Sequence, residues 1–179
     1  MMDVKELKMV IEALLFTAQD PVSVDEIQEV AEGFAPRVIR ETILKLQGEY
    51  ESNERGIFIT EIAGGFQMCT RAEFSPILKK FHQIDSRQRL SRPALETLAI
   101  ISYKQPIVRS EVEAIRGVDV GGVLKTLLEK NLIKVMGRKK APGSPIIYGT
   151  TGEFLRYFGL ANLDELPEVK ELVGSKGGV

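Results

Sequence analysis

The sequence has little of the chemistry on which most enzymes depend. Among its 179 residues there is one cysteine, one histidine and no tryptophan. These counts exclude a zinc site built from several histidine or cysteine ligands, and a lone cysteine excludes an internal disulfide. Only Cys69 and His82 are left to form a cysteine–histidine catalytic pair. We interpret Cys69, in an apolar run, as a small strand residue of the core, and His82 as a helix-end residue.

Long apolar runs and phosphate-binding motifs are missing too. The longest stretch without a charged residue is 141–152, which holds two prolines and three glycines, whereas a membrane-spanning helix needs roughly 20 apolar residues. Charged residues precede the first apolar run, so no signal peptide is expected. The chain contains no GxxxxGK[ST], GxGxxG or GxSxG motif. We therefore expect a cytoplasmic protein that is not an enzyme, with no cofactor, metal, small-molecule substrate or membrane contact.

What the sequence does contain is an internal repeat, at a separation of about 80 to 85 residues. EALLFTAQDPVSVDEI, starting at Glu12, corresponds to ETLAIISYKQPIVRSEV, starting at Glu96, and TRAEF at 70–74 corresponds to TTGEF at 150–154. A repeat of this size indicates two tandem domains. We place the first domain at 1–84, the second at 90–160, and an acidic, partly disordered tail at 161–179.

Each copy has three helical segments followed by two strands. The expected helices are 4–17, 24–31 and 36–50 in the first domain, and 93–103, 109–116 and 119–130 in the second. Ser23 and Glu26 have the spacing of a capping box, whereas Val108 stands where the second copy should have a cap. The third helices carry core residues at helical spacing: Ile39, Ile43, Leu46 and Tyr50 in one, and Val120, Val123, Leu124 and Leu127 in the other.

Two strands with a tip between them follow each third helix. GIFITEI and FQMCT flank a turn at 63–65, and LIKVM and IIYGTT flank the tip GRKKAPGSP. Short helices at 73–81 and 153–158 come after these wings. We therefore predict a mostly α (α+β) protein of tandem winged-helix domains, each with three helices and a two-stranded wing.

Winged helices often bind DNA, and charge tests that function. Residues 1–89 carry 11 basic and 15 acidic side chains, whereas residues 90–158 carry 11 and 6. Phosphate would repel the first domain and attract the second weakly. The third helix of the second domain would have to read the bases, but Asp119, Gly121 and Gly122 occupy its leading turn, where base readout needs forked donors and acceptors.

The two glycines therefore have two readings. They ease packing against the second helix, or they leave a bare surface on which another chain lies. A nonspecific DNA contact through the basic tip at Arg138, Lys139 and Lys140 also stays open, beside the alternative that this tip is only a solvated turn.

The first helix has two apolar sides. Val4, Leu7, Ile11, Leu14, Leu15 and Ala18 form one stripe, and Met2, Met9, Ala13 and Phe16 form another, nearly opposite. A helix of this kind is central in its domain or lies at an interface. We expect the second stripe, with Met9, Ala13 and Phe16, to form a homodimer interface.

The second domain closely resembles the segregation and condensation protein B family. The resemblance rests on ETLAII, YKQPI, IRGV, LLEKNLI, GRKKAPG, YGTT and EFLRYFGL; it covers residues 5–166 and is dense from 90 onward. The family usually has Gly-Arg-Pro in the second wing, where this chain has Gly143-Ser144-Pro145. Any contact of that arginine is therefore lost here or moved to Arg138.

The resemblance implies a bacterial accessory subunit of a condensin-like complex, associated with the nucleoid. Such proteins dimerise through the first domain, and two copies bind the middle segment of a kleisin subunit, which links the heads of an SMC ATPase. By resemblance and residue type, the candidate partner-binding residues are Tyr103, Gln105, Pro106, Arg109, Arg116, Gly117, Gly121, Gly122, Arg138 and Tyr148. The alternative function is a tandem winged-helix DNA-binding transcription regulator.

Overall fold

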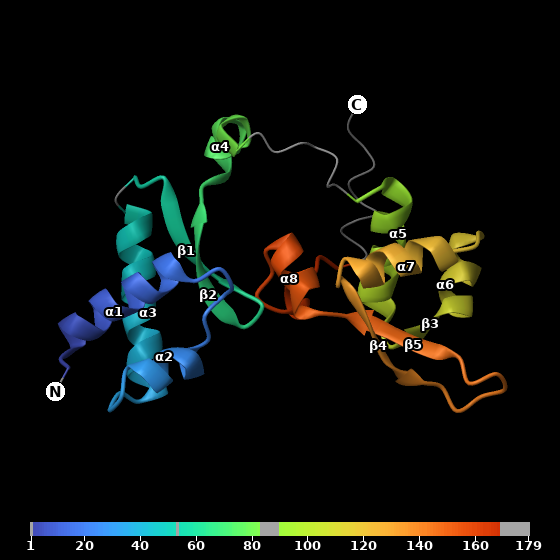
Figure 1. Cartoon of the computed structure of the whole chain (residues 1–179), viewed down its shortest axis with the longest axis horizontal. Coiled ribbons are helices and arrows are strands. Elements are labelled where there is room, and N and C mark those ends of the chain that lie inside the picture. Colours follow the sequence, from blue (N-terminus) through green and yellow to red (C-terminus); the bar gives the residue numbers. More distant parts are fainter. Residues whose placement is uncertain (1, 53, 83–89, 169–179) are drawn as a thin grey trace. The chain divides into compact units, whose positions relative to one another are not determined.

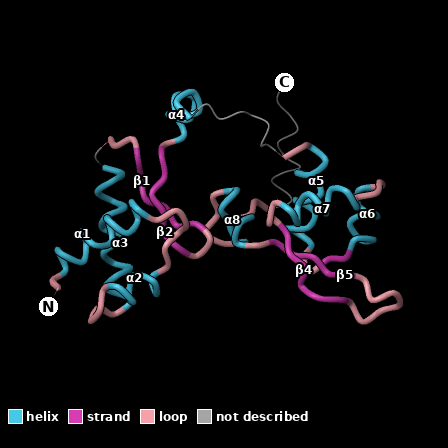
Figure 2. Tube along the Cα trace, in the orientation of Figure 1, coloured by secondary structure: helices cyan, strands magenta, loops and turns pink. Residues whose placement is uncertain are grey.

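A computed structural model describes residues 2–52, 54–82 and 90–168 (Figure 1). The chain divides into two compact units: Met1–Ile84 with Leu160–Glu165, and Asp85–Gly159 with Leu166–Val179. Helices supply most of the regular structure, and the strands form two small antiparallel sheets (Figure 2). This is the mostly α, winged-helix-like architecture that the repeat predicts.

The first unit has the expected order of parts. Helices α1 (Val4–Thr17), α2 (Val24–Val30) and α3 (Pro36–Ser52) precede the hairpin of β1 (Ile57–Ile62) and β2 (Gly65–Thr70). A 3-10 turn, η1 (Ala72–Phe74), leads into α4 (Ser75–His82). The capping box predicted from Ser23 and Glu26 is present at the start of α2.

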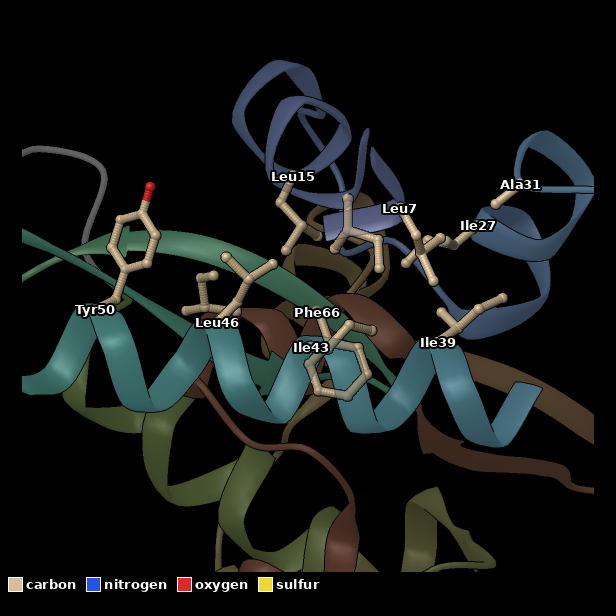
Figure 3. Packing of buried hydrophobic residues seen from close by; sticks show 11 residues of the cluster. Leu7, Leu15, Ile27, Ala31, Ile39, Ile43, Leu46, Tyr50 and Phe66 are labelled. Carbon is tan, nitrogen blue, oxygen red and sulfur yellow. The ribbon is translucent and has the colours of Figure 1, made fainter. Parts of the chain in front are cut away.

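The core of the first unit lies between α3 and the helices α1 and α2. Ile39, Ile43, Leu46 and Tyr50 line up along one side of α3 and are buried, as their spacing predicts (Figure 3). Leu7 and Leu15 of α1 and Ile27 of α2 face them. Phe66 of β2 closes the cluster, and its backbone also exchanges hydrogen bonds with Val22 (2.8 Å each).

The second unit repeats this plan with one additional strand. Its elements are α5 (Arg92–Lys104), β3 (Ile107–Val108), α6 (Arg109–Arg116), α7 (Gly121–Glu129), β4 (Ile133–Arg138), β5 (Ile146–Thr150) and α8 (Gly152–Phe158). The wing is three-stranded, in the order β3-β5-β4, because Ile107 and Val108 pair with β5. The prediction of a two-stranded wing therefore missed one strand in this unit. Strand β3 has only two residues, which are too few to show strand periodicity.

Most boundaries differ from the predicted ones by one or two residues, and two of the differences affect the site or the domain limits. Helix α7 begins at Gly121 rather than Asp119, because the Asp119 carboxylate accepts a hydrogen bond from the Gly121 N–H (3.0 Å) ahead of the helix. Residues Leu160–Glu165, which end in the 3-10 turn η3 (Leu163–Glu165), group with the first unit. There the backbone N–H groups of Ala63 and Gly64 donate to Leu160 and Ala161. Residues 161–165 are thus ordered chain packed on the first hairpin; the rest of the predicted tail beyond 168 and the linker 83–89 lie outside the described residues.

No helix in the described part of the chain is long and apolar enough to cross a membrane. Likewise, the described residues hold no group of three or more histidine, cysteine, aspartate or glutamate side chains placed to bind a metal ion.

Candidate partner-binding surfaces

Helix α1 carries the exposed apolar stripe that its sequence predicts. Asp3 caps the helix by accepting from the Glu6 N–H (2.8 Å), while Leu7, Ile11 and Leu15 point into the core. Met9 is 56% exposed and Phe16 75% exposed, and Ala13 is exposed between them. A shallow depression of about 570 Å³ lies along this stripe, lined by Met2, Glu6, Met9, Val10 and Ala13. Large apolar side chains exposed together in this way mark an interaction surface more often than they mark ordinary solvent-facing residues.

In the second unit, Arg109 explains one of the two glycines of α7. Its guanidinium forms ion pairs with Glu113 (2.7 Å) and with Asp119. A Cβ atom on Gly121 would lie 3.0 Å from Arg109 Nη1, which is closer than side chains normally approach. The ion pair with Glu113, and then the charge of Asp119, raises the pKa of Arg109. Gly121 therefore makes room for the arginine of α6, so the packing reading holds for this glycine.

Gly122 has no such role within the chain. A methyl group placed on it would meet no heavy atom within 4 Å, its φ is not in the left-handed region, and the residue is exposed. Nothing among the described residues thus requires glycine at this position. The reading in which a second chain lies against a bare helix surface remains for Gly122 alone.

Arg116 joins two helices. Its Nη1 donates to the Pro93 carbonyl (2.8 Å) and to Thr97 Oγ1 (2.7 Å), and its Nη2 pairs with Glu96 (3.0 Å). Only 14% of its side chain is exposed. Gly117, with a φ of 70°, ends α6 in the left-handed conformation. The structure gives both residues an intramolecular task.

Gln105 and Tyr148 also belong to the interior of the second unit. The Gln105 amide donates to Thr150 Oγ1 (3.0 Å), and its carbonyl oxygen accepts from the Thr150 N–H (2.7 Å), so the side chain ties the end of α5 to β5. Tyr148 is 7% exposed, so it is a core residue. Tyr103 is half-buried and its hydroxyl donates to the Pro167 carbonyl (2.6 Å). Pro106, which follows a cis peptide bond, is exposed.

The basic wing tip is mostly engaged. Arg138 Nη1 donates to the Ser144 carbonyl (3.0 Å), so this arginine is held against the backbone of the wing tip. Lys139 pairs with Glu111 of α6 (2.8 Å), and this bond is the main reason that the pKa of Glu111 is lowered. Glu111 also accepts from the Val108 N–H (3.1 Å), which supplies the helix cap that Val108 cannot. Lys140 is exposed and is the member of the triplet without a partner among the described residues.

Two exposed surfaces therefore have side chains or backbone that could contact a partner. One is the α1 stripe; the other is the neighbourhood of the Arg109 guanidinium and the exposed Gly122 at the start of α7, with Pro106 exposed elsewhere on the same unit. Cys69, by contrast, is half-buried in β2, and burial raises the pKa of its thiol, which is opposite to the activation of a catalytic cysteine. The sequence predicts an interaction role for both surfaces, and that role stays a prediction. The sequence pattern does not reveal the exposed apolar face of α4, because eight residues are too few for it to stand out.

Known proteins resemble the chain over nearly its whole length. The family model for the segregation and condensation complex subunit ScpB matches residues 9–169. A segregation and condensation protein B from Moorella thermoacetica is 48% identical over 170 residues, which is 95% of this chain and 86% of that protein. The corresponding protein from Symbiobacterium thermophilum is 50% identical over 163 residues, or 91% of this chain and 74% of that protein.

Among solved structures, the dimer of an ScpB N-terminal domain complexed with a ScpA peptide is 37% identical. It covers 44% of this chain and 96% of its own, with a TM-score of 0.41. The family model and the full-length relatives agree with the motifs of the second domain, and on their account this chain belongs to the ScpB family, the B subunits of segregation and condensation complexes.

Proposed function

We propose that this protein is a non-enzymatic accessory subunit of a bacterial SMC–kleisin condensin complex. It binds the kleisin subunit, of the segregation and condensation protein A type, as a homodimer, and reaches the SMC ATPase through that kleisin. In this role it supports chromosome condensation and segregation in the cytoplasm, in association with the nucleoid. Membership of a family described as complex subunits supports this proposal.

The observation that carries the proposal is the leading turn of α7. In a winged helix that reads DNA, this turn presents side chains that hydrogen-bond to bases. Here it presents the Asp119 carboxylate and the exposed Gly122, so it offers phosphate the wrong charge and bases no donor. Because no contact among the described residues requires glycine at position 122, the missing side chain suits the close approach of another polypeptide backbone.

The partner would lie on the exposed side of the second unit. Pro106 and the ring of Tyr103 offer apolar area, Arg109 and Arg138 are charged groups held in place by their own ion pair or hydrogen bond, and Gly122 offers close approach. Tyrosine and arginine are enriched among the residues that dominate binding energy. Gln105, Arg116, Gly117, Gly121 and Tyr148 would act by holding this surface in shape.

Coexpression tests the kleisin contact directly. The protein and the kleisin subunit from the same organism should copurify and elute together from a size-exclusion column. Gly122 is exposed and an added Cβ would meet no heavy atom within 4 Å, so replacing it with arginine should separate the two proteins while leaving the helical circular dichroism unchanged. Co-elution of this variant would place the kleisin elsewhere.

The homodimer is tested on α1. Phe16→Asp adds a charge to a side chain that is 75% exposed, so the monomer should still fold. Light scattering should then give 19.9 kDa instead of about twice that mass. An unchanged dimer mass would remove Phe16 from the interface.

DNA binding is the competing function, and the wing separates the two. A phosphate contact by Lys140 would lower the salt dependence of duplex binding by about one unit of slope when the lysine becomes alanine. We expect weak binding that does not depend on base sequence. Tight binding to one sequence would instead identify a transcription regulator.

A further inference from the structure

Helix α4 stands on the first unit without burying any of its own residues. It extends from the end of β2, beyond the hairpin (Figure 1). Ile77 is 67% exposed and Phe81, one turn further along, is 77% exposed. Isolated helices shorter than about 12–15 residues are marginal in water, and α4 has eight. An apolar face on so short a helix needs a surface to cover it.

The helix is nevertheless held in position at its base. The Arg71 N–H donates to the Gly56 carbonyl (3.0 Å), and the Phe74 ring packs where a Cβ on Gly56 would lie 3.5 Å from it. The exposed pair, Ile77 and Phe81, is therefore presented outward from a fixed attachment. Helix α4 is thus attached firmly at its N-terminal end, and its apolar side chains are exposed toward its C-terminal end.

The same unit has a second apolar face without a partner, the α1 stripe. Phe16 and Met9 are exposed there beside the shallow depression of about 570 Å³. The α4 face belongs to a helix of eight residues, whereas the α1 stripe belongs to a helix of 14 and includes a depression. The α1 depression offers apolar area that could cover the Phe81 ring. Phe81 in turn is a large side chain that could fill the depression.

Charge favours pairing α4 with α1 over pairing either helix with itself. The last turn of α4 carries Lys79, Lys80 and His82 and no acidic residue. Two copies of α4 side by side would bring these lysines together, which costs binding energy. The α1 depression includes the Glu6 carboxylate, so it can receive the basic end of α4.

We propose that α4 of one copy of this chain docks on the α1 stripe of a second copy, and that the exchange is reciprocal. This inference rests on the proposed homodimer and names its contacts. A two-fold axis makes each contact occur twice, so both apolar faces of both copies are covered in one closed assembly. Aromatic side chains bury about 150–250 Å² each. Two copies of Phe16 and Phe81 with their neighbours therefore approach the ~1,200 Å² of the smaller stable interfaces.

Complementation between two variants tests the reciprocal contact. Phe16→Asp and Phe81→Asp, each alone, should weaken the dimer by about 30-fold or more, as loss of a central aromatic contact does. At a concentration where each variant is a 19.9 kDa monomer by light scattering, an equal mixture should regain the dimer mass. In the mixed dimer, α4 of the Phe16→Asp copy meets α1 of the Phe81→Asp copy, and that contact is wild type.

A matched control is available on the second unit. Ile115 is an exposed apolar helix residue (53%), and Ile115→Asp should leave the dimer mass unchanged. Circular dichroism spectra like that of the wild type establish that each variant is folded; Phe16→Ser and Phe81→Ser replace any variant that is not.

The outcomes separate this inference from the homodimer itself. A mixture that stays monomeric overturns the reciprocal contact, and so does a Phe81→Asp variant that remains dimeric while Phe16→Asp does not. In the second case α1 still forms a dimer, without α4. A monomeric wild-type protein overturns the homodimer together with this inference.

Discussion

Replacing Gly122 with alanine asks whether a second chain lies on α7. In the free protein, the added methyl group meets no heavy atom within 4 Å, and φ is ordinary for an alanine. The substitution therefore loses no contact and lowers the conformational entropy of the unfolded chain. Such changes raise the free energy of unfolding by about 0.4–1 kcal/mol. Urea denaturation of the isolated protein should show this gain.

Kleisin binding should move in the opposite direction. If a partner backbone lies against Gly122, the methyl group overpacks that contact, at a cost of about 1–3 kcal/mol. Since every 1.4 kcal/mol is a factor of ten, the Kd from calorimetric titration should rise about 5-fold to 150-fold. A more stable protein that binds its partner less well is a combination that ordinary destabilisation cannot produce.

Gly48 provides the matched control. It lies within α3 of the first unit, is exposed, and also has no heavy atom within 4 Å of an added Cβ. Gly48→Ala should stabilise the protein by about the same amount and leave the Kd unchanged. Equal Kd values for Gly122→Ala and the wild type would refute the reasoning, because the bare turn would then serve no partner. A loss of stability in Gly122→Ala would contradict the geometry itself.

Three further predictions concern other residues. Arg116→Ala should lower the free energy of unfolding by about 2–3 kcal/mol in urea, since it leaves the Thr97 hydroxyl and the Pro93 carbonyl without their donor; a change below 0.5 kcal/mol would show that water replaces the guanidinium. Arg109→Lys, by contrast, keeps the charge but loses the forked geometry, and should weaken kleisin binding more than it lowers stability, with equal losses arguing against a partner contact. Cys69 should react with iodoacetamide more slowly than free cysteine at pH 8, because burial raises its thiol pKa and leaves less thiolate. Its rate should keep rising at pH values where free cysteine has levelled off, and a faster reaction than that of free cysteine would support a catalytic role for this thiol.

Much of the fold follows from local sequence patterns. The buried stripe of α3, the buried Val120, Leu124 and Leu127 at and within α7, and the capping box at Ser23 depend on residues a few positions apart, so they can be read without tertiary information. Val123, which the same spacing assigns to the core, is only half-buried. The second stripe of α1 could be found in the same way. Strand β3 could not, since its two residues acquire strand character only by pairing with β5.

The tasks of the polar candidates depend on distant residues. Arg109 and Arg116 lie seven positions apart on one short helix and look alike in the sequence. In the structure the first reaches Asp119 across the loop before α7 and half of its side chain stays exposed, whereas the second reaches back to Pro93 and Thr97 and is nearly covered. Gly121 and Gly122 divide in the same manner, because only one of them lies under a side chain of α6.

The return of Leu160–Glu165 to the first hairpin bears on how the protein can be dissected. Although residues 1–84 look like a self-sufficient piece, a fragment ending there would leave the turn N–H groups of Ala63 and Gly64 without the carbonyls of Leu160 and Ala161. At about 0.5–1.5 kcal/mol for each hydrogen bond, that fragment would be weaker than the same region in the intact polypeptide.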